Sequence, residues 1–168
     1  MVPHSRATLR SICFTVFLVL SGCGAVFSFE DPKSVDFPTL TLTDDPNQFL
    51  VCPEGYCLRA EPHLISPVYD ASIDDVRQAW DSVVAAAPRT KRMGVFADGF
   101  QVVDVQRSAI LRFPDVVTTQ FIRTGDNGVM LAVYSRSVYG KSDFGVNEKR
   151  ITAWLQELAV ALEKRAHR

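Results

Sequence analysis

Residues 91–138 read KRMGVFADGFQVVDVQRSAILRFPDVVTTQFIRTGDNGVMLAVYSRSV, and this stretch decides the fold. Apolar runs alternate here with turn residues such as Asp98-Gly99 and the run 125–128, a pattern typical of consecutive hairpins. Adjacent strands joined by such short connections run antiparallel. The pattern predicts four strands, at about Lys91–Ala97, Gln101–Phe113, Val116–Arg123 and Val129–Val138.

An amphipathic helix is predicted on each side of this stretch. The first begins after Ser72, which with Asp75 resembles a capping box, and ends near Ala87 because Pro88 follows. The second begins after Asn147 as N-cap, and its apolar residues recur at helical spacing as far as Leu162. Both helices can cover one sheet face. We therefore expect an α+β fold, a two-layer sandwich of about four antiparallel strands with two helices on one face.

Hydroxyl side chains continue the buried face of the last predicted strand. Val129, Leu131 and Val133 face one way, so by the two-residue period Ser135 and Ser137 face the same way. Buried hydroxyls need hydrogen-bond partners. The glycine-containing connection 139–146 offers them, and its Asp143 either accepts backbone N–H groups or pairs with Arg150.

Residues 135–150 read SRSVYGKSDFGVNEKR. They resemble the C-terminal signature of the bacterial and plastid family called domain of unknown function 1499, Ser-x-Ser-x-x-Gly-x-Ser-Asp-x-Gly-x-Asn-x-x-Arg, and every named position is present. Looser similarity covers Ala87-Pro88-Arg89, Arg107-Ser108 and Phe113-Pro114-Asp115, whereas the cysteine loop is shorter than the family's and lacks its Asn. The resemblance spans roughly Cys52 to Leu162 and implies no established activity.

Three interpretations of this segment stay open. In the first, Ser135, Ser137, Asp143, Asn147 and Arg150 form a structural latch. In the second, the helix N-terminus and nearby arginines bind a carboxylate or phosphate. The third is a hydrolase that uses Ser135 or Ser137 with Asp143 and Arg150. The candidate residues are Arg107, Ser135, Arg136, Ser137, Gly140, Ser142, Asp143, Asn147 and Arg150.

Two cysteines stand five positions apart in Cys52-Pro53-Glu54-Gly55-Tyr56-Cys57. In an oxidising compartment this pattern predicts a small disulfide loop. The alternatives are free thiols or a metal site with His63, but two sulfurs and one imidazole are an incomplete ligand set. We expect no metal and no cofactor.

The N-terminus has the pattern of an export signal. Arg6 and Arg10 precede the apolar run 12–20, and Leu20-Ser21-Gly22-Cys23 resembles the lipobox of bacterial lipoproteins. The alternatives are an uncleaved anchor and plain secretion. We expect a signal peptide at 1–22, a lipidated N-terminus and extended tether at 23–50, and one globular domain at 51–168. The other possibility for the tether is that Thr39–Thr43 adds an edge strand.

Composition limits the function further. The chain has 168 residues, 47% of them hydrophobic and 22% charged, with a formal net charge of −1, which argues against a disordered chain and a nucleic-acid partner. We expect a lipid-anchored, periplasm-facing protein of the cell envelope, and Gly24 after the cysteine favours the outer membrane. Besides the bilayer, its partner is expected to be an envelope protein or a small anionic ligand. A non-catalytic role is favoured, and the alternative is the small hydrolase.

Overall fold

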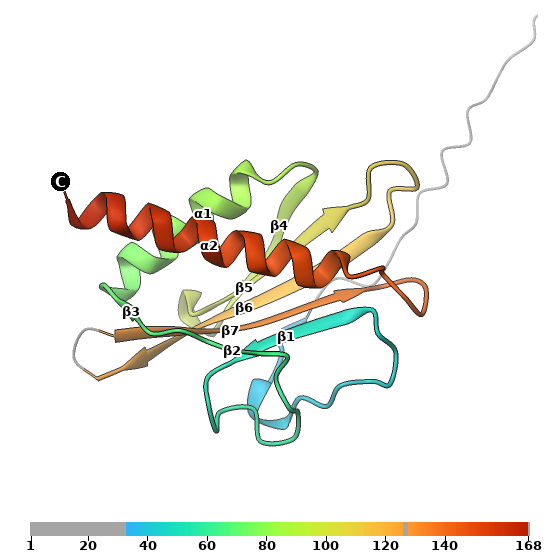
Figure 1. Ribbon diagram of the computed structural model, residues 1–168, viewed down its shortest axis with the longest axis horizontal. Coiled ribbons are helices and arrows are strands. Elements are labelled where there is room, and N and C mark those ends of the chain that lie inside the picture. The colour runs from blue at the N-terminus through green and yellow to red at the C-terminus, as the bar shows by residue number, and fades with distance from the viewer. Residues whose placement is uncertain (1–32, 126–127, 168) are drawn as a thin grey trace, which may run out of the picture.

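The computed structural model describes residues 33–125 and 128–167 (Figure 1). The predicted signal peptide, Cys23 and residues 24–32 of the predicted tether lie outside the described residues. The elements in chain order are η1 (Phe37–Thr39), β1 (Gln48–Cys52), β2 (Leu64–Ile65), β3 (Tyr69–Asp70), α1 (Ile73–Ala86), β4 (Thr90–Phe96), η2 (Ala97–Gly99), β5 (Gln101–Arg107), β6 (Pro114–Thr124), β7 (Gly128–Ser137) and α2 (Val146–Ala166).

The sheet has seven strands in the order β2-β1-β7-β6-β5-β4, with β3 also pairing with β7. Strands β4 to β7 form the predicted antiparallel meander. The prediction of a four-stranded, purely antiparallel sheet was wrong, because β1 adds to the free edge of β7 and β2 runs parallel to β1. Strands β2 and β3 have two residues each, too few to show a two-residue period in the sequence.

Both helices cover one face of the sheet, as predicted (Figure 1). Ser72 caps α1, its Oγ accepting a hydrogen bond from the backbone N–H of Asp75. The helices meet at the two tryptophans, Trp80 and Trp154, whose rings pack edge to face with centroids 5.9 Å apart. Alternate residues of the central strands, such as Val117 and Leu131, complete this core.

The opposite face of the sheet carries a second core. Phe37, Leu50, Cys52, Ala132 and Tyr134 are buried together there. The stretch 35–50 was expected to be part of an extended tether. Instead Val35, Phe37, Leu40 and Leu42 pack on this face, and residues 48–50 belong to β1. The stretch has a 3₁₀ turn at 37–39 and no strand at 39–43. The physical reason is that β7 is apolar on both faces, so each face needs a cover.

Two element boundaries differ from the predictions. Strand β5 ends at Arg107, because the Ser108 N–H donates to the Phe113 carbonyl and its Oγ accepts from the Phe113 N–H, which closes a loop. Helix α2 begins at Val146 with Gly145 as N-cap, in place of Asn147. Gly145 has a φ of 74°, a left-handed conformation that glycine adopts without steric cost.

Candidate functional site

The signature residues meet where β7 ends and α2 begins. Ser135 and Ser137 project toward the helices, as the two-residue period predicts, and Ser135 is fully buried while Ser137 is partly buried. Ser135 faces the first two turns of α2, from which Asn147 and Arg150 reach it. The strand end and the helix start are thus joined through side chains.

Arg150 is the centre of this cluster and is 8% exposed. Its Nη2 donates to Oδ2 of Asp115 on β6 at 2.5 Å, and its Nε donates to Oε1 of Gln106 on β5 at 2.6 Å. Its Nη1 donates to the Ser135 Oγ at 3.0 Å. The guanidinium therefore connects three neighbouring strands to α2. A buried charge needs such a set of partners because desolvation is costly.

Asn147 is fully buried and uses both ends of its amide. Its Oδ1 accepts from Ser135 Oγ at 2.6 Å and from Arg150 Nη1 at 2.7 Å. Its Nδ2 lies 3.0 Å from the carbonyl oxygen of Asn47 and 2.7 Å from Oδ2 of Asp143. One amide thus joins the residue before β1, the strand β7 and the connection to α2.

Asp143 takes the first of its two predicted roles. Its carboxylate accepts the backbone N–H of Gly145 at 2.9 Å and that of Asn147 at 2.7 Å, so it satisfies the free N–H groups at the start of α2. Arg150 pairs with Asp115 instead. Nearby, the Gly140 carbonyl accepts a hydrogen bond from Nδ2 of Asn47, and Gly140 has a φ of 86°.

We call Asn47, Gln106, Asp115, Ser135, Ser137, Asp143, Asn147 and Arg150 the signature latch. Among the described residues, the buried side-chain atoms without a hydrogen-bond partner are Tyr69 Oη, Trp80 Nε1, Asp104 Oδ2 and Thr119 Oγ1. None of them belongs to the latch. Its polar groups satisfy one another, and the cluster offers neither an exposed nucleophile nor a free cation for an anion.

Four candidate residues lie outside the latch, and one of them is Gly140, whose carbonyl is bonded to Asn47. Arg107 lies on the same face of β5 as Val103 and Val105, which is the face turned away from the helices. Its Nη1 donates to the Arg112 carbonyl. Arg136 is exposed, and exposed Ser142 accepts the backbone N–H of Phe144. The three candidate arginines are Arg107, Arg136 and Arg150. They do not converge on one point, as a site for an anion would require.

Sequence reasoning missed three members of the latch. Asn47 was assigned to the tether, and Gln106 carried no distinguishing signal. Asp115 did have a signal, since it belongs to the loosely matching segment Phe113-Pro114-Asp115 and stands as a charged residue before an apolar strand. Its role depends on the register of β6 with β7, which places Asp115 opposite Ser137.

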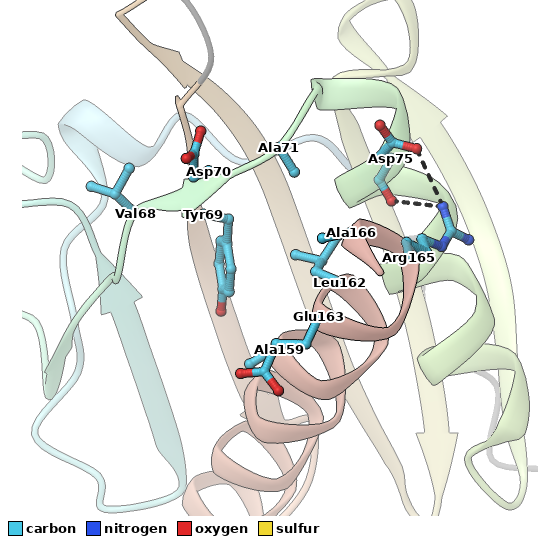
Figure 2. Close-up of a pocket in the computed structure, with 10 residues that line it drawn as sticks. All are labelled: Val68, Tyr69, Asp70, Ala71, Asp75, Ala159, Leu162, Glu163, Arg165 and Ala166. Carbon is cyan, nitrogen blue, oxygen red and sulfur yellow. Dashed lines mark hydrogen bonds and ion pairs between the residues drawn. The ribbon is translucent and has the colours of Figure 1, made fainter. Parts of the chain in front are cut away.

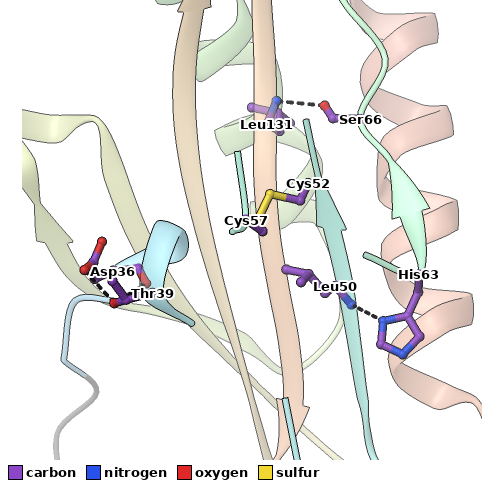
Figure 3. The surroundings of a disulfide bond; sticks show 8 residues. All are labelled: Asp36, Thr39, Leu50, Cys52, Cys57, His63, Ser66 and Leu131. Atoms are coloured by element: carbon purple, nitrogen blue, oxygen red, sulfur yellow. Dashed lines mark hydrogen bonds between the residues drawn. A yellow bond between two sulfur atoms is a disulfide. The ribbon is translucent and has the colours of Figure 1, made fainter. Parts of the chain in front are cut away.

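A disulfide joins Cys52 and Cys57, as predicted (Figure 3). His63 lies close by: its Nδ1 accepts the backbone N–H of Leu50 at 3.0 Å, and its ring stacks on Phe49. Within residues 33–125 and 128–167 there is no group of three His, Cys, Asp or Glu side chains that could hold a metal ion. In the same ranges, no helix is both long enough and apolar enough to cross a bilayer.

A second polar cluster lies at the β4 edge of the sheet, on the face that the helices cover. Arg92 on β4 donates from Nε to Asp104 Oδ1 at 2.6 Å and from Nη2 to Asp81 Oδ1 at 2.7 Å. Burial raises the pKa of the Asp104 carboxyl, and the bond from Arg92 offsets part of that effect. This cluster ties β4 and β5 to α1.

An apolar hollow lies between residues 64–71 and α2. It consists of a part of about 530 Å³ beside β2 and a part of about 460 Å³ beside the C-terminal turns of α2, and Val68, Tyr69 and Ala159 line both. Figure 2 shows the residues that line the second part. We call it the α2 groove. Burial raises the pKa of Tyr69 in its wall to about 12. Asp70, Asp75 and Glu163 stand at one mouth against a single cation, Arg165, so this mouth is acidic.

Comparison with known families identifies the class of protein that this fold and latch define. The model of the family "Protein of unknown function (DUF1499)" matches residues 40–158, so the chain belongs to this family. The matched region contains the whole signature latch. The family resemblance seen in residues 135–150 is therefore confirmed.

The chain is also similar to a solved structure, that of an uncharacterized protein from Rhizobium leguminosarum. The two share 15% sequence identity, and the match covers 59% of this chain and 94% of the other with a TM-score of 0.40. No curated protein matches the chain.

Proposed function

We propose that this protein is a lipid-anchored envelope lipoprotein whose domain is a non-catalytic binding module. The observation that carries the non-catalytic part is the signature latch, in which the most distinctive residues of the chain are buried and bonded to one another. Catalytic groups must reach a substrate through a pocket. Here Ser135 is fully buried, and His63, the histidine between Cys52 and Leu162, is bonded to Leu50.

The sequence supports the anchor. An acylated Cys23 would fasten the chain to a bilayer, because several acyl chains together hold a protein stably where one does not. The Cys52–Cys57 disulfide fits this location, since structural disulfides persist in oxidising compartments such as the periplasm.

The α2 groove is the surface on which we place the partner. Its larger part is lined by apolar side chains with the exception of Thr152 and Gln156, and its mouth carries an excess of carboxylates. This chemistry fits a protein segment with apolar side chains next to a basic residue, and it disfavours a small anionic ligand.

The anchor is tested by the change Cys23→Ser, with Cys13→Ser as the matched control because it removes a thiol from the same segment outside the lipobox. Growth with a palmitate analogue that can be tagged should label the wild-type chain and the Cys13→Ser variant. The Cys23→Ser variant should stay unlabelled and unprocessed. Labelling of the Cys23→Ser variant would contradict the proposal.

The groove is tested by a photoreactive side chain at Val68, with the same side chain at exposed Thr41 as control. In native envelopes, position 68 should form a discrete cross-link that Glu163→Lys weakens, because the change removes a carboxylate from the acidic mouth. Equal cross-linking from both positions, or none from position 68, would exclude the groove as the binding surface.

A further inference from the structure

Two loops at the latch end of the sheet expose large apolar side chains. In the loop between β5 and β6, Ile110 is 89% exposed and Leu111 is 60% exposed. In the connection between β7 and α2, Phe144 is 89% exposed. Side chains of this size are seldom left in water without a purpose when several gather at one end of a domain.

The two loops lie side by side, because β6 begins where β7 ends (Figure 1). The Val138 N–H donates to the Pro114 carbonyl at 3.1 Å, and the rings of Phe113 and Tyr139 lie 5.8 Å apart. Together they form one surface, which we call the apolar tip: residues 108–113 and 139–145.

The loops are held in shapes that project these side chains. The bonds between Ser108 and Phe113 close the first loop at its base, and Asp143 fixes the second through the Gly145 N–H. Arg112 and Phe144 adopt φ values of 59° and 54°, which are unusual for residues with side chains. Such conformations persist where the surroundings impose them, and they often mark functional surfaces.

Cations flank the apolar side chains. Arg112 adjoins Leu111, and Lys141 is exposed in the second loop. The carboxylate of Asp143 is engaged in capping α2, and Asp44, Asp45 and Glu148 are acidic residues at the same end. Apolar side chains beside Arg and Lys are the composition of surfaces that enter the headgroup region of a bilayer.

We propose that the apolar tip inserts into the interface of an anionic lipid bilayer and so orients the domain on its membrane. This inference rests on the proposed lipid anchor, which keeps the domain close to the bilayer. Ile110, Leu111 and Phe144 enter the boundary between headgroups and acyl chains, while Arg112 and Lys141 meet lipid phosphates.

The fold makes this orientation compatible with partner binding. The α2 groove lies beside β3, which pairs with the first residues of β7, whereas the apolar tip follows the last residues of the same strand. Strand β7 has 10 residues, so its first residues, beside the acidic mouth of the groove, lie about 30 Å from the apolar tip, and the part of the groove beside β2 lies closer to the tip. With the tip in the bilayer, the acidic mouth of the groove faces away from it.

The test uses the full lipidated protein in vesicles of phosphatidylglycerol and phosphatidylethanolamine with brominated acyl chains. Phe144→Trp places a fluorophore at the tip, and Leu58→Trp places one at a 76% exposed site directly after the cysteine loop as control. Trp80 and Trp154 are buried and contribute the same background to both variants. We expect at least twofold quenching of the added fluorescence in Phe144→Trp and none in Leu58→Trp.

Each other outcome identifies a different failure. If labelling shows that Cys23 is acylated but Phe144→Trp is not quenched, the anchor stands and the inserted tip is wrong. If quenching is equal in phosphatidylcholine vesicles, the role of Arg112 and Lys141 is wrong. If the Phe144→Trp spectrum shifts only when envelope proteins are added to the vesicles, the tip is a protein interface and the proposal fails.

Discussion

Arg150 shows how one buried residue can connect the members of a family signature. Its guanidinium is buried among Asp115, Gln106, Ser135 and Asn147, each of which is bonded to it. A buried ion pair adds little net stability when it is complete, but removing one partner leaves an uncompensated charge. Removing one member of the latch should therefore lower the free energy of unfolding by more than the complete latch adds to it.

Arg150→Ala should lower the free energy of unfolding by about 3–5 kcal/mol, because Asp115 then stays buried without its counter-charge. Urea denaturation followed by circular dichroism measures the loss. Lys149→Ala is the matched control, since Lys149 is the exposed neighbour on the same helix and should change stability by less than about 0.5 kcal/mol. Equal effects of the two changes would contradict the structural role of the latch.

For a single residue, the sequence predicts which face of the sheet its side chain is on, but not which side chain it bonds to. The two-residue period correctly places Ser135 on the helix side, because it depends only on neighbours along the strand. Whether Arg150 meets Asp143 or Asp115 depends on the register between β6 and β7 and on the path of the connecting loop. Spacing along the chain contains neither.

Among the elements, the short strands depend on their neighbours for existence. Strand β1 pairs with the end of β7 and β3 with its beginning, and between them the Ser66 Oγ accepts the N–H of Leu131 at 3.0 Å (Figure 3). One side-chain oxygen thus replaces a strand where the chain leaves the sheet edge. The residues of β2 and β3 have no local pattern that predicts such an arrangement. These two strands were therefore not predicted, whereas both long helices were.

The disulfide constrains the same edge, since it links the last residue of β1 to the loop that follows. Cys52→Ala with Cys57→Ala should cost about 2 kcal/mol of unfolding free energy, the value expected for closing a loop of this length. Reductant provides the control: dithiothreitol should destabilise the wild type by a similar amount and leave the double variant unchanged. If reductant has no effect on the wild type, the bridge does not contribute to stability.

For the molecule as a whole, the sheet is an inner layer with cover on both faces. The helices cover one face, and residues around Phe37 cover the other. The expected sandwich of two layers captured the first cover but not the second, because prolines and threonines in residues 32–46 give no regular period. Phe37 in this segment is buried against Ala132 and Tyr134, which lie about 95 positions further along the chain.

Phe37→Ala should therefore destabilise the protein by about 3 kcal/mol, the usual cost of removing a fully buried phenylalanine side chain. Thr41→Ala, an exposed change in the same segment, should alter stability by less than about 0.5 kcal/mol. Thermal or urea denaturation distinguishes the two. A neutral Phe37→Ala would mean that this segment is a free linker after all.

The position of β7 at the centre of the sheet affects when the protein can fold. Its neighbour β1 is made early, but Val51 pairs with Val133, about 80 residues later in the chain. During translation the first strand must wait for nearly all of the polypeptide before it meets its partner. The finished fold is therefore reached only after synthesis is almost complete, in whichever compartment the chain has by then entered.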